Sequence, residues 1–522
     1  MKNRNITLTT ILLAFGIVAL SQIAQAVVPA PDGGYPGGNT AEGTNALLSR
    51  STGTYNTAVG IFSLLSLTDG SFCTGIGAGT LLANTGDQNT ATGAGALLSN
   101  ITGGNNTADG AFALFSNTEG GANTANGFQA LFSNTTGIDN TANGAAALFN
   151  NTTGFDNTAT GVNALFSNTT GSDNTAHGAF ALSNVTTGNF NTATGEGALF
   201  SNDTGEFNTA SGMQALFTNH TGSKNTADGF DALANNTTGS NNTAAGDQAL
   251  FHNTIGQDNT ASGFQALLNN TTGENNTANG VDALLSNTTG GGNTANGASA
   301  LFSNTTGNSN TAIGGGALFH NTTGSVNVAV GDFAGGNLTT GDVNIDILNP
   351  GVAGETNTIR IGVTQTRTFI AGIFGTNVSG STVVVNSDGQ LGVAASSRRF
   401  KREIKPMDQT SEAILALKPV TFHYKSDASG TPQFGLIAEE VAEVNPDLVV
   451  RDENGEIYTV RYDQVNAMLL NEFLKEHRKV QDLEKGMAAV TAQLNEQGAQ
   501  IQKVSAHLEM SKPATSVVLN NP

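Results

Sequence analysis

Apolar and polar side chains along residues 39–349 follow a pattern that repeats every 17 residues. In one clear copy, residues 140–156, a polar Asn-Thr pair comes first and an apolar Ala-Leu-Phe run follows. The leading asparagine recurs through 19 registers, and Cys73 takes its place once. A unit of this length is too short for two helices, and its Gly, Asn and Thr favour turns. The pattern predicts a mostly β protein, a parallel β-roll or solenoid with two short strands and two turns per coil, roughly 90 Å long.

The apolar run predicts a contact outside the single coil. Ala147, Leu148 and Phe149 are consecutive, and adjacent side chains of a strand point to opposite faces. A thin coil buries one face, so a second chain is the simplest cover for the phenylalanines, and a wider coil is the alternative. The Asn and Thr positions are expected to stack as hydrogen-bonded ladders. Gly154 and its equivalents are expected to adopt a left-handed backbone conformation in the turn.

The repeat stops after residue 349, and two further regions follow. Residues 350–395 predict a β-rich neck, with strands at 358–361, 368–371 and 382–385. Residues 396–479 begin with a basic cluster and predict a small α+β domain, with a helix at 411–417, strands at 420–424 and 458–462, and a strand followed by a helix at 434–444. Residues 480–510 carry apolar side chains at alternating spacings of three and four, which predicts a coiled coil. The tail, 511–522, is expected to be disordered.

The net charge excludes a partner class. A formal net charge of −20 argues against nucleic acid, which needs a basic face. The single cysteine, Cys73, cannot form an internal disulfide, so stability is expected from burial, hydrogen-bond ladders and oligomerisation. Aspartates such as Asp139 and Asp156 share a repeat position with Asn, Phe and Gly in other units, so no calcium ladder, other metal site or cofactor is expected.

The N-terminus has the features of an export signal. Residues 1–26 combine a positive start, a short apolar run and a small-x-small cleavage site that ends at Ala26. A membrane anchor would need about 20 apolar residues, so no transmembrane anchor is expected. Residues 27–38 are then a linker, and the protein is expected to be secreted or displayed at the cell surface.

The repeat resembles the head repeats of trimeric autotransporter adhesins. The Asn-Thr-Ala-x-Gly element and the apolar pair after it carry the resemblance, over residues 38–349. The resemblance implies left-handed parallel β-rolls wound as trimers.

A second resemblance concerns residues 396–479. The blocks at 396–404, 432–441, 446–449 and 462–473 are similar to the endosialidase-type intramolecular chaperone domain that ends phage tail spikes and fibres. The resemblance implies that the domain cleaves itself with a Ser-Lys dyad, with Ser396 as nucleophile and Lys401 as base. The bond cut would join Ala395 to Ser396. Ser397 stands where the family usually has aspartate, which bears on the rate and completeness of cleavage.

These features predict an exported, trimeric structural or adhesive fibre whose C-terminal domain directs assembly and then cleaves itself off. The expected partners are two further copies of the chain and a cell-surface or glycan receptor. Three alternatives stay open: a trimerisation domain that does not cleave, a polysaccharide-acting enzyme, and an ice- or crystal-binding rod. Outward-facing threonine rows, at the Thr141 or the Thr152 and Thr153 positions, would favour the rod.

Overall fold

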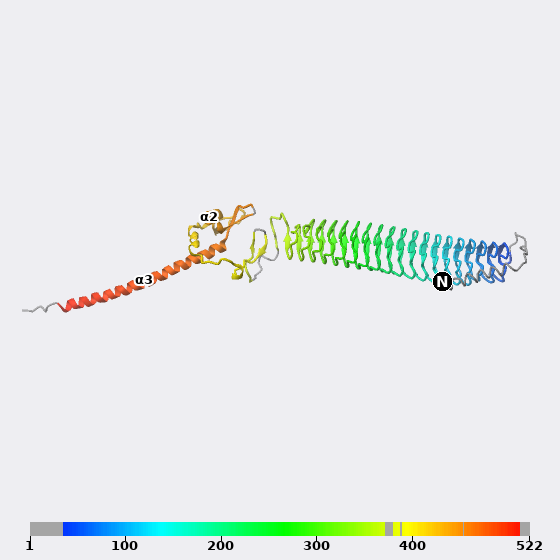
Figure 1. The fold of residues 1–522 in the computed structure, drawn as a ribbon, viewed down its shortest axis with the longest axis horizontal. Coiled ribbons are helices and arrows are strands. Elements are labelled where there is room, and N and C mark those ends of the chain that lie inside the picture. The colour runs from blue at the N-terminus through cyan, green and yellow to red at the C-terminus, as the bar shows by residue number, and fades with distance from the viewer. Residues whose placement is uncertain (1–34, 371–378, 387–388, 453, 512–522) are drawn as a thin grey trace, which may run out of the picture. The chain divides into compact units, whose positions relative to one another are not determined.

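The computed structural model describes residues 35–370, 379–386, 389–452 and 454–511. The chain divides into two compact units, with the boundary between Thr368 and Phe369. The first unit holds the repeats and the second holds the C-terminal elements (Figure 1). The predicted signal peptide, most of the linker after it, and all of the predicted tail except Ser511 lie outside the described residues.

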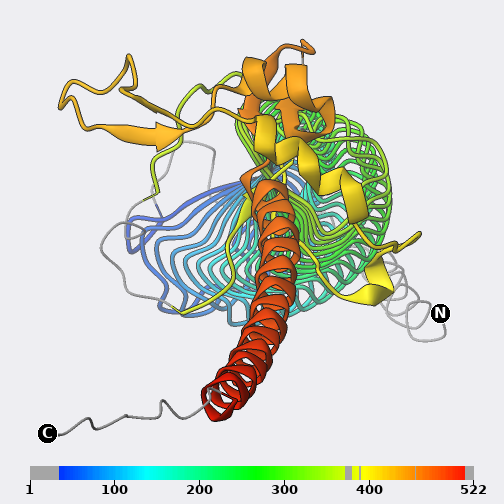
Figure 2. The same cartoon turned by 90° about the vertical axis from the view of Figure 1, so that its left-hand side faces the viewer.

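The first unit is a parallel β-solenoid, as the repeat predicts. Each coil contributes one three-residue strand to a single 20-stranded sheet, and neighbouring strands pair in parallel with equivalent residues opposite each other, as in Thr141↔Thr158. Viewed along the axis of the solenoid, successive coils overlie one another with a gradual rotation (Figure 2). The strands are β1 (Thr40–Glu42), β2 (Thr57–Val59), β3 (Thr74–Ile76), β4 (Thr90–Thr92), β5 (Thr107–Asp109), β6 (Thr124–Asn126), β7 (Thr141–Asn143), β8 (Thr158–Thr160), β9 (Thr175–His177), β10 (Thr192–Thr194), β11 (Thr209–Ser211), β12 (Thr226–Asp228), β13 (Thr243–Ala245), β14 (Thr260–Ser262), β15 (Thr277–Asn279), β16 (Thr294–Asn296), β17 (Thr311–Ile313), β18 (Val328–Val330), β19 (Ile345–Ile347) and β20 (Ile359–Ile361).

The prediction of a second strand in each coil is wrong. The Ala-Leu-Phe segment and the residues on either side of it form a series of turns over residues 145–150, in which Ala146 and Leu148 have φ angles of 55° and 53°. Such angles are rare for residues other than glycine, and here the bonds between coils hold them in place: the Leu148 N–H donates to the Ala164 carbonyl at 2.9 Å. Because the segment turns, Leu148 points into the coil while Phe149 lies half-buried on its outside.

Glycine serves two different purposes in the coil. Gly154 does not have a left-handed φ, so that expectation is wrong; it is needed because a Cβ there would lie 2.3 Å from the Gly171 carbonyl oxygen. The left-handed glycine is instead Gly144, with a φ of 144°, directly after the strand. The stacking of the coils therefore requires glycine at two positions of each unit.

The core of the solenoid combines small apolar side chains with two ladders of buried asparagine. Ala142, Ala147 and Leu148 are fully buried, and their equivalents form one continuous apolar cluster. In the first ladder the Asn140 N–H donates to the Asn123 side-chain oxygen at 3.0 Å, and the Asn140 amide donates to a carbonyl of its own coil. These ladders confirm the predicted stacking and satisfy polar groups that would otherwise be costly to bury.

The second ladder runs through the Asn151 position and is broken once. The Asn151 side-chain amide donates to the Asn134 oxygen at 2.8 Å, and this pattern recurs until Val185 occupies the position. Within the described residues the Asn168 side-chain oxygen then has no hydrogen-bond partner. On the other side of the break, the Asn202 amide keeps its bond to the Gly205 carbonyl.

Val185→Asn is expected to stabilise the solenoid by about 1–3 kcal/mol, because it gives the buried Asn168 oxygen a donor. Thermal unfolding followed by circular dichroism measures the effect. Val185→Ala is the matched control: it removes apolar contacts without adding a donor, so it should lower the midpoint. A lower midpoint for Val185→Asn as well would show that the break is packed too tightly for an amide.

The solenoid continues into the segment predicted as the neck. The strand expected at 358–361 is present as β20, and it pairs in parallel with β19. The strand expected at 382–385 is present in part, as β21 (Val384–Val385), which pairs with β22 (Leu391–Gly392) in a hairpin. No strand forms at Thr368–Ile370 among the described residues, and Ala371 lies outside them.

The second unit contains a small α+β domain and one long helix. Its core consists of Val441, Leu448, Val449, Val460 and Met468. The helix predicted at 411–417 is a 3-10 helix, and the other predicted elements are present with shifted ends. The elements are η1 (Arg398–Phe400), η2 (Asp408–Ala416), β23 (Val420–Phe422), β24 (Gln433–Gly435), α2 (Ala438–Val444), η3 (Pro446–Leu448), β25 (Val449–Arg451), β26 (Ile457–Val460) and α3 (Tyr462–Met510).

Candidate functional site

Ser396 and Lys401 lie close together in the single chain. The turn between them is η1, in which the Phe400 N–H donates to the Ser397 carbonyl at 3.0 Å. This turn returns the chain on itself, and the Lys401 ammonium donates to the Ser396 hydroxyl at 3.4 Å. A nucleophile and a base must be within hydrogen-bond reach, so the spacing of five residues is compatible with the predicted dyad.

The surroundings of this pair are open and positively charged. Ser396 and Lys401 are both exposed, as are Arg398 and Arg399. The Arg399 guanidinium lies 4.6 Å from the centre of the Phe400 ring. Lysine acts as a base only when it is neutral, and both burial and nearby cations favour the neutral form. In the single chain the nearby cations are present, but Lys401 is not buried.

A second polar cluster in this unit was not predicted from the sequence. The fully buried Ser411 hydroxyl donates to the Glu472 carboxylate and accepts from the Asn471 amide at 2.7 Å. Lys475 forms an ion pair with Glu472 at 2.7 Å. The Lys475 ammonium, and after it the Ser411 hydroxyl, hold the pKa of Glu472 below its ordinary value. This cluster joins η2 to the start of α3, so it fixes the long helix to the domain.

The apolar positions of α3 beyond this domain are uncovered in the single chain. The predicted coiled-coil positions are between 49% and 70% exposed, as much as ordinary surface residues. Apolar side chains repeated over several heptads and left in water indicate an interface with another helix. They are Val480, Leu483, Met487, Val490, Leu494, Ile501, Val504 and Leu508.

An interrupted row of phenylalanines runs along the outside of the solenoid. We call it the phenylalanine row, and its members are Phe115, Phe132, Phe149, Phe166, Phe200, Phe217, Phe251, Phe302 and Phe319. Rings of neighbouring coils stack face to face with centroids 5.0 Å apart, as in Phe132 and Phe149, and again in Phe302 and Phe319. Because these rings are half-buried and stack between coils, they do not fill the inside of a wider coil. Further apolar side chains in the turn directly after the strand are more exposed, such as Phe128 at 53%.

The two sets of threonines differ in their freedom to contact solvent molecules. Thr141 and its equivalents face outward on the sheet and are mostly exposed, so this row is of the outward-facing kind. The Thr152 hydroxyl is half-buried and donates to the Thr169 carbonyl of the next coil at 2.9 Å, while the neighbouring Thr153 is exposed. The other outward-facing position of each strand, that of Asn143, does not form a regular row, because His177 and Asp228 occupy it in two coils.

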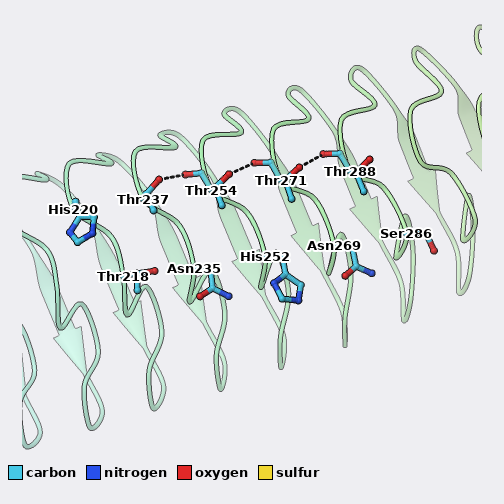
Figure 3. A pocket seen from close by; sticks show the side chains of 10 residues that line it. All are labelled: Thr218, His220, Asn235, Thr237, His252, Thr254, Asn269, Thr271, Ser286 and Thr288. Carbon is cyan, nitrogen blue, oxygen red and sulfur yellow. Dashed lines mark hydrogen bonds between the residues drawn. The ribbon is translucent and has the colours of Figure 1, made fainter.

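A groove with a volume of about 840 Å³ crosses five coils of the solenoid (Figure 3). Two parallel rows of side chains line it, one from the position directly after the phenylalanine row and one from the Thr152 position. The first row is Thr218, Asn235, His252, Asn269 and Ser286, and the second is His220, Thr237, Thr254, Thr271 and Thr288. The sequence alone does not predict this groove. Its formation depends on which coils carry a residue other than serine at the position directly after the phenylalanine row, where serine is the common residue.

Asp346 is a buried carboxylate near the end of the solenoid. It occupies the position that alanine fills in other coils, is 1% exposed, and its two oxygens have no hydrogen-bond partner in the described part of the chain. Arg360 stands opposite it in β20 and forms an ion pair with Glu355 at 2.8 Å. Burial, and then the charge of Glu355, raise the pKa of Asp346 to about 6, while Arg360 acts against this rise.

Asp346→Ala is expected to stabilise the solenoid at neutral pH. The folded state binds the proton of Asp346 more tightly than the unfolded state, so the cost of ionising it is absent below pH 3.8 and complete above pH about 6. The shift of about two units corresponds to about 3 kcal/mol, which the variant should recover above pH 6 and not below pH 4. Chemical unfolding across this pH range measures the difference. The exposed Asp332→Ala is the control, and an equal gain there would rule out burial as the cause.

Part of the C-terminal unit matches a known family, and the match begins at Ser396. Residues 396–450 match the family model described as chaperone of endosialidase. No curated protein and no solved structure matches the chain. Together with the solenoid, the match indicates a tail-fibre-like protein with a chaperone domain, and such a domain implies oligomerisation.

None of the helices described is both long enough and apolar enough to cross a membrane. Within the same residues, no group of three or more His, Cys, Asp or Glu side chains is placed to hold a metal ion.

Proposed function

We propose that this protein is an exported, trimeric fibre whose C-terminal domain, residues 396–479, brings three chains together and then cuts itself off before Ser396. The observation that carries the proposal is the exposed apolar seam of α3, which follows the segment that matches the chaperone family. A helix with such a seam is stable in water when other helices cover it. The coiled coil, residues 480–510, would hold three chains in register while the slow, non-local sheet of the solenoid forms.

The phenylalanine row supports contact between the solenoids of the three chains. Partly exposed rings that stack in runs along a rod, the longest from Phe115 to Phe166, favour an interface over contact with water. A second and third copy carry the same row at the same height, so symmetric contacts would cover its continuous run from Phe115 to Phe166. The fibre, residues 27–395, would remain a trimer after the chaperone has left.

The proposed cleavage is an attack by Ser396 on the peptide bond before it. The Ser396 hydroxyl gives its proton to neutral Lys401 and attacks the Ala395 carbonyl carbon. The C–N bond breaks, the nitrogen of Ser396 takes up a proton, and an ester joins Ala395 to the Ser396 oxygen. Water then hydrolyses the ester, which leaves a carboxylate on Ala395 and restores the hydroxyl.

Assembly would control this reaction through desolvation. The 3.4 Å contact between Lys401 and Ser396 is already present in one chain, but both side chains are exposed. Another chain that covered the pair would remove water and favour neutral Lys401, with Arg398 and Arg399 adding repulsion. Cleavage would then occur only in assembled chains, and the fibre would be locked kinetically once the chaperone left.

The test is the mass of the purified full-length protein, in solution and after denaturation. The proposal expects a trimer in light scattering and two fragments that separate at Ala395 and Ser396. A trimer that stays full length would reduce the domain to a trimerisation chaperone, with Ser397 in place of aspartate as the first suspect. A full-length monomer would overturn the proposal.

An ice- or crystal-binding rod is the second candidate, and the exposed Thr141 row favours it. Ordered hydroxyls on the sheet could match a regular surface, but His177 and Asp228 break the neighbouring row. Inhibition of ice recrystallisation by the purified fibre would support this candidate, and its absence would remove it.

A further inference from the structure

We propose that the groove across five coils binds a linear, uncharged polysaccharide. This inference rests on the proposed function, because it supplies the ligand that the fibre would hold. Three features of the groove carry it: its unpartnered polar groups, its lack of fixed charge, and its length along the rod (Figure 3).

Two neighbouring side chains of the first row have unused hydrogen-bonding capacity. In the described structure neither Asn235 nor His252 makes a side-chain hydrogen bond, although their neighbours do: Thr218 donates to the Ala234 carbonyl at 2.5 Å, and Asn269 donates to the Leu285 carbonyl at 3.0 Å. The His252 ring stands edge-on to Phe251, with centroids 4.6 Å apart, which holds it in place. Asn235 and His252 therefore offer an amide and an imidazole, one coil apart, to a ligand.

The second row offers acceptors and apolar contact. The hydroxyls of Thr237, Thr254 and Thr271 each donate to the carbonyl of the next coil, at 2.9, 2.9 and 3.0 Å (Figure 3). Their hydrogens are thus occupied while their oxygens can still accept, and their methyl groups provide an apolar surface. A sugar ring presents hydroxyls at its edge and C–H groups on its faces, so this lining matches both parts of it.

The charge of the lining selects among polymers. None of the ten lining residues is Asp, Glu, Lys or Arg, so the groove has no fixed cation to hold a polyanion. It also has no carboxylate pair of the kind that glycosidases use, so the polymer would be bound and not hydrolysed. Peptide strands are a poorer match, because backbone groups of these coils already bond to the next coil, as the Thr254 N–H does to the Thr271 carbonyl.

The length of the groove favours an extended ligand over a single sugar. Coils stack at the spacing of parallel strands, so five coils span about 20 Å. The polar side chains recur once per coil, and one residue of an extended glycan chain is about as long as that spacing. Successive sugar residues would therefore meet successive coils in equivalent positions.

The test is calorimetric titration of the full-length protein with cellohexaose, chitohexaose, mannohexaose and, as the anionic comparator, hexagalacturonate. At least one neutral hexasaccharide is expected to bind saturably. Asn235→Ala and His252→Ala should each weaken that binding about tenfold, as expected for the loss of one hydrogen bond to the ligand. The chain offers matched controls at the same repeat position outside the groove, Asn150→Ala and His320→Ala, and these should bind like the unchanged protein.

Three results would overturn the proposal: no binding of any neutral hexasaccharide, binding of hexagalacturonate alone, or equal losses in the controls. Tighter binding of an extended peptide than of any glycan would do the same. Light scattering and gel analysis of the same samples keep this test separate from the proposed function. Glycan binding by an unassembled chain would leave the groove assignment standing, and a cleaved trimer that binds no glycan would remove the groove assignment alone.

Discussion

Ser396→Ala and Lys401→Ala are each expected to leave the chain at full length, while the unchanged protein separates into two fragments. Without its hydroxyl, residue 396 cannot form the ester with Ala395. Without the lysine, the hydroxyl keeps its proton and remains a poor nucleophile. Because each group is needed for the same step, either loss should lower the cleavage rate by a factor on the order of a thousand or more. Intact mass and denaturing gels over time measure the rate.

The matched control for this experiment is a nearby lysine. Lys405 is exposed and lies four residues after Lys401, so Lys405→Ala removes a cation without changing the pair and should still cleave. Trimer mass must be the same in all variants, since unassembled chains would fail to cleave for a different reason. Continued cleavage of Ser396→Ala at the same bond would contradict the assignment of the nucleophile.

Much of the solenoid could be predicted because its rules repeat. Asn140 and its equivalents show the period, and the buried amide ladder follows from stacking identical coils. The path within a coil could not be predicted, because the left-handed φ of Leu148 goes against the ordinary preference of leucine and is stabilised by bonds to the next coil. The role of Gly154 was misassigned for the same reason: its constraint comes from the Gly171 carbonyl, 17 residues away.

The candidate site was predictable where it is local and not where it depends on distant residues. Ser396 and Lys401 are five residues apart, and one turn of η1 is enough to bring them together. Ser411 and Glu472 meet although 61 residues separate them, and neither residue type nor spacing indicates their contact. Asn235 and His252 are similarly uninformative alone, and only the stacking of their coils places them in one groove.

A second large effect is expected when carboxylates are introduced into the seam of α3, the row of exposed apolar side chains from Val480 to Leu508. Val490→Glu together with Leu494→Glu would place two carboxylates per chain at the centre of the proposed coiled coil. Burying an apolar side chain of this size contributes about 1.5–3 kcal/mol, so two positions in three chains amount to on the order of 10 kcal/mol per trimer. Repulsion between carboxylates brought together adds to this loss. The variant is therefore expected to be a monomer in light scattering, at concentrations where the unchanged protein is a trimer.

The control keeps the same chemistry and changes only the face of the helix. Ala492 lies between the two altered positions, is exposed, and points away from the seam, so Ala492→Glu should remain a trimer. If assembly completes the Ser396 site, the double variant should also stay uncleaved although its Ser396 and Lys401 are intact. Efficient cleavage in a monomeric double variant would show that one chain suffices, and the exposed pair held at 3.4 Å would then be the whole active site rather than part of it.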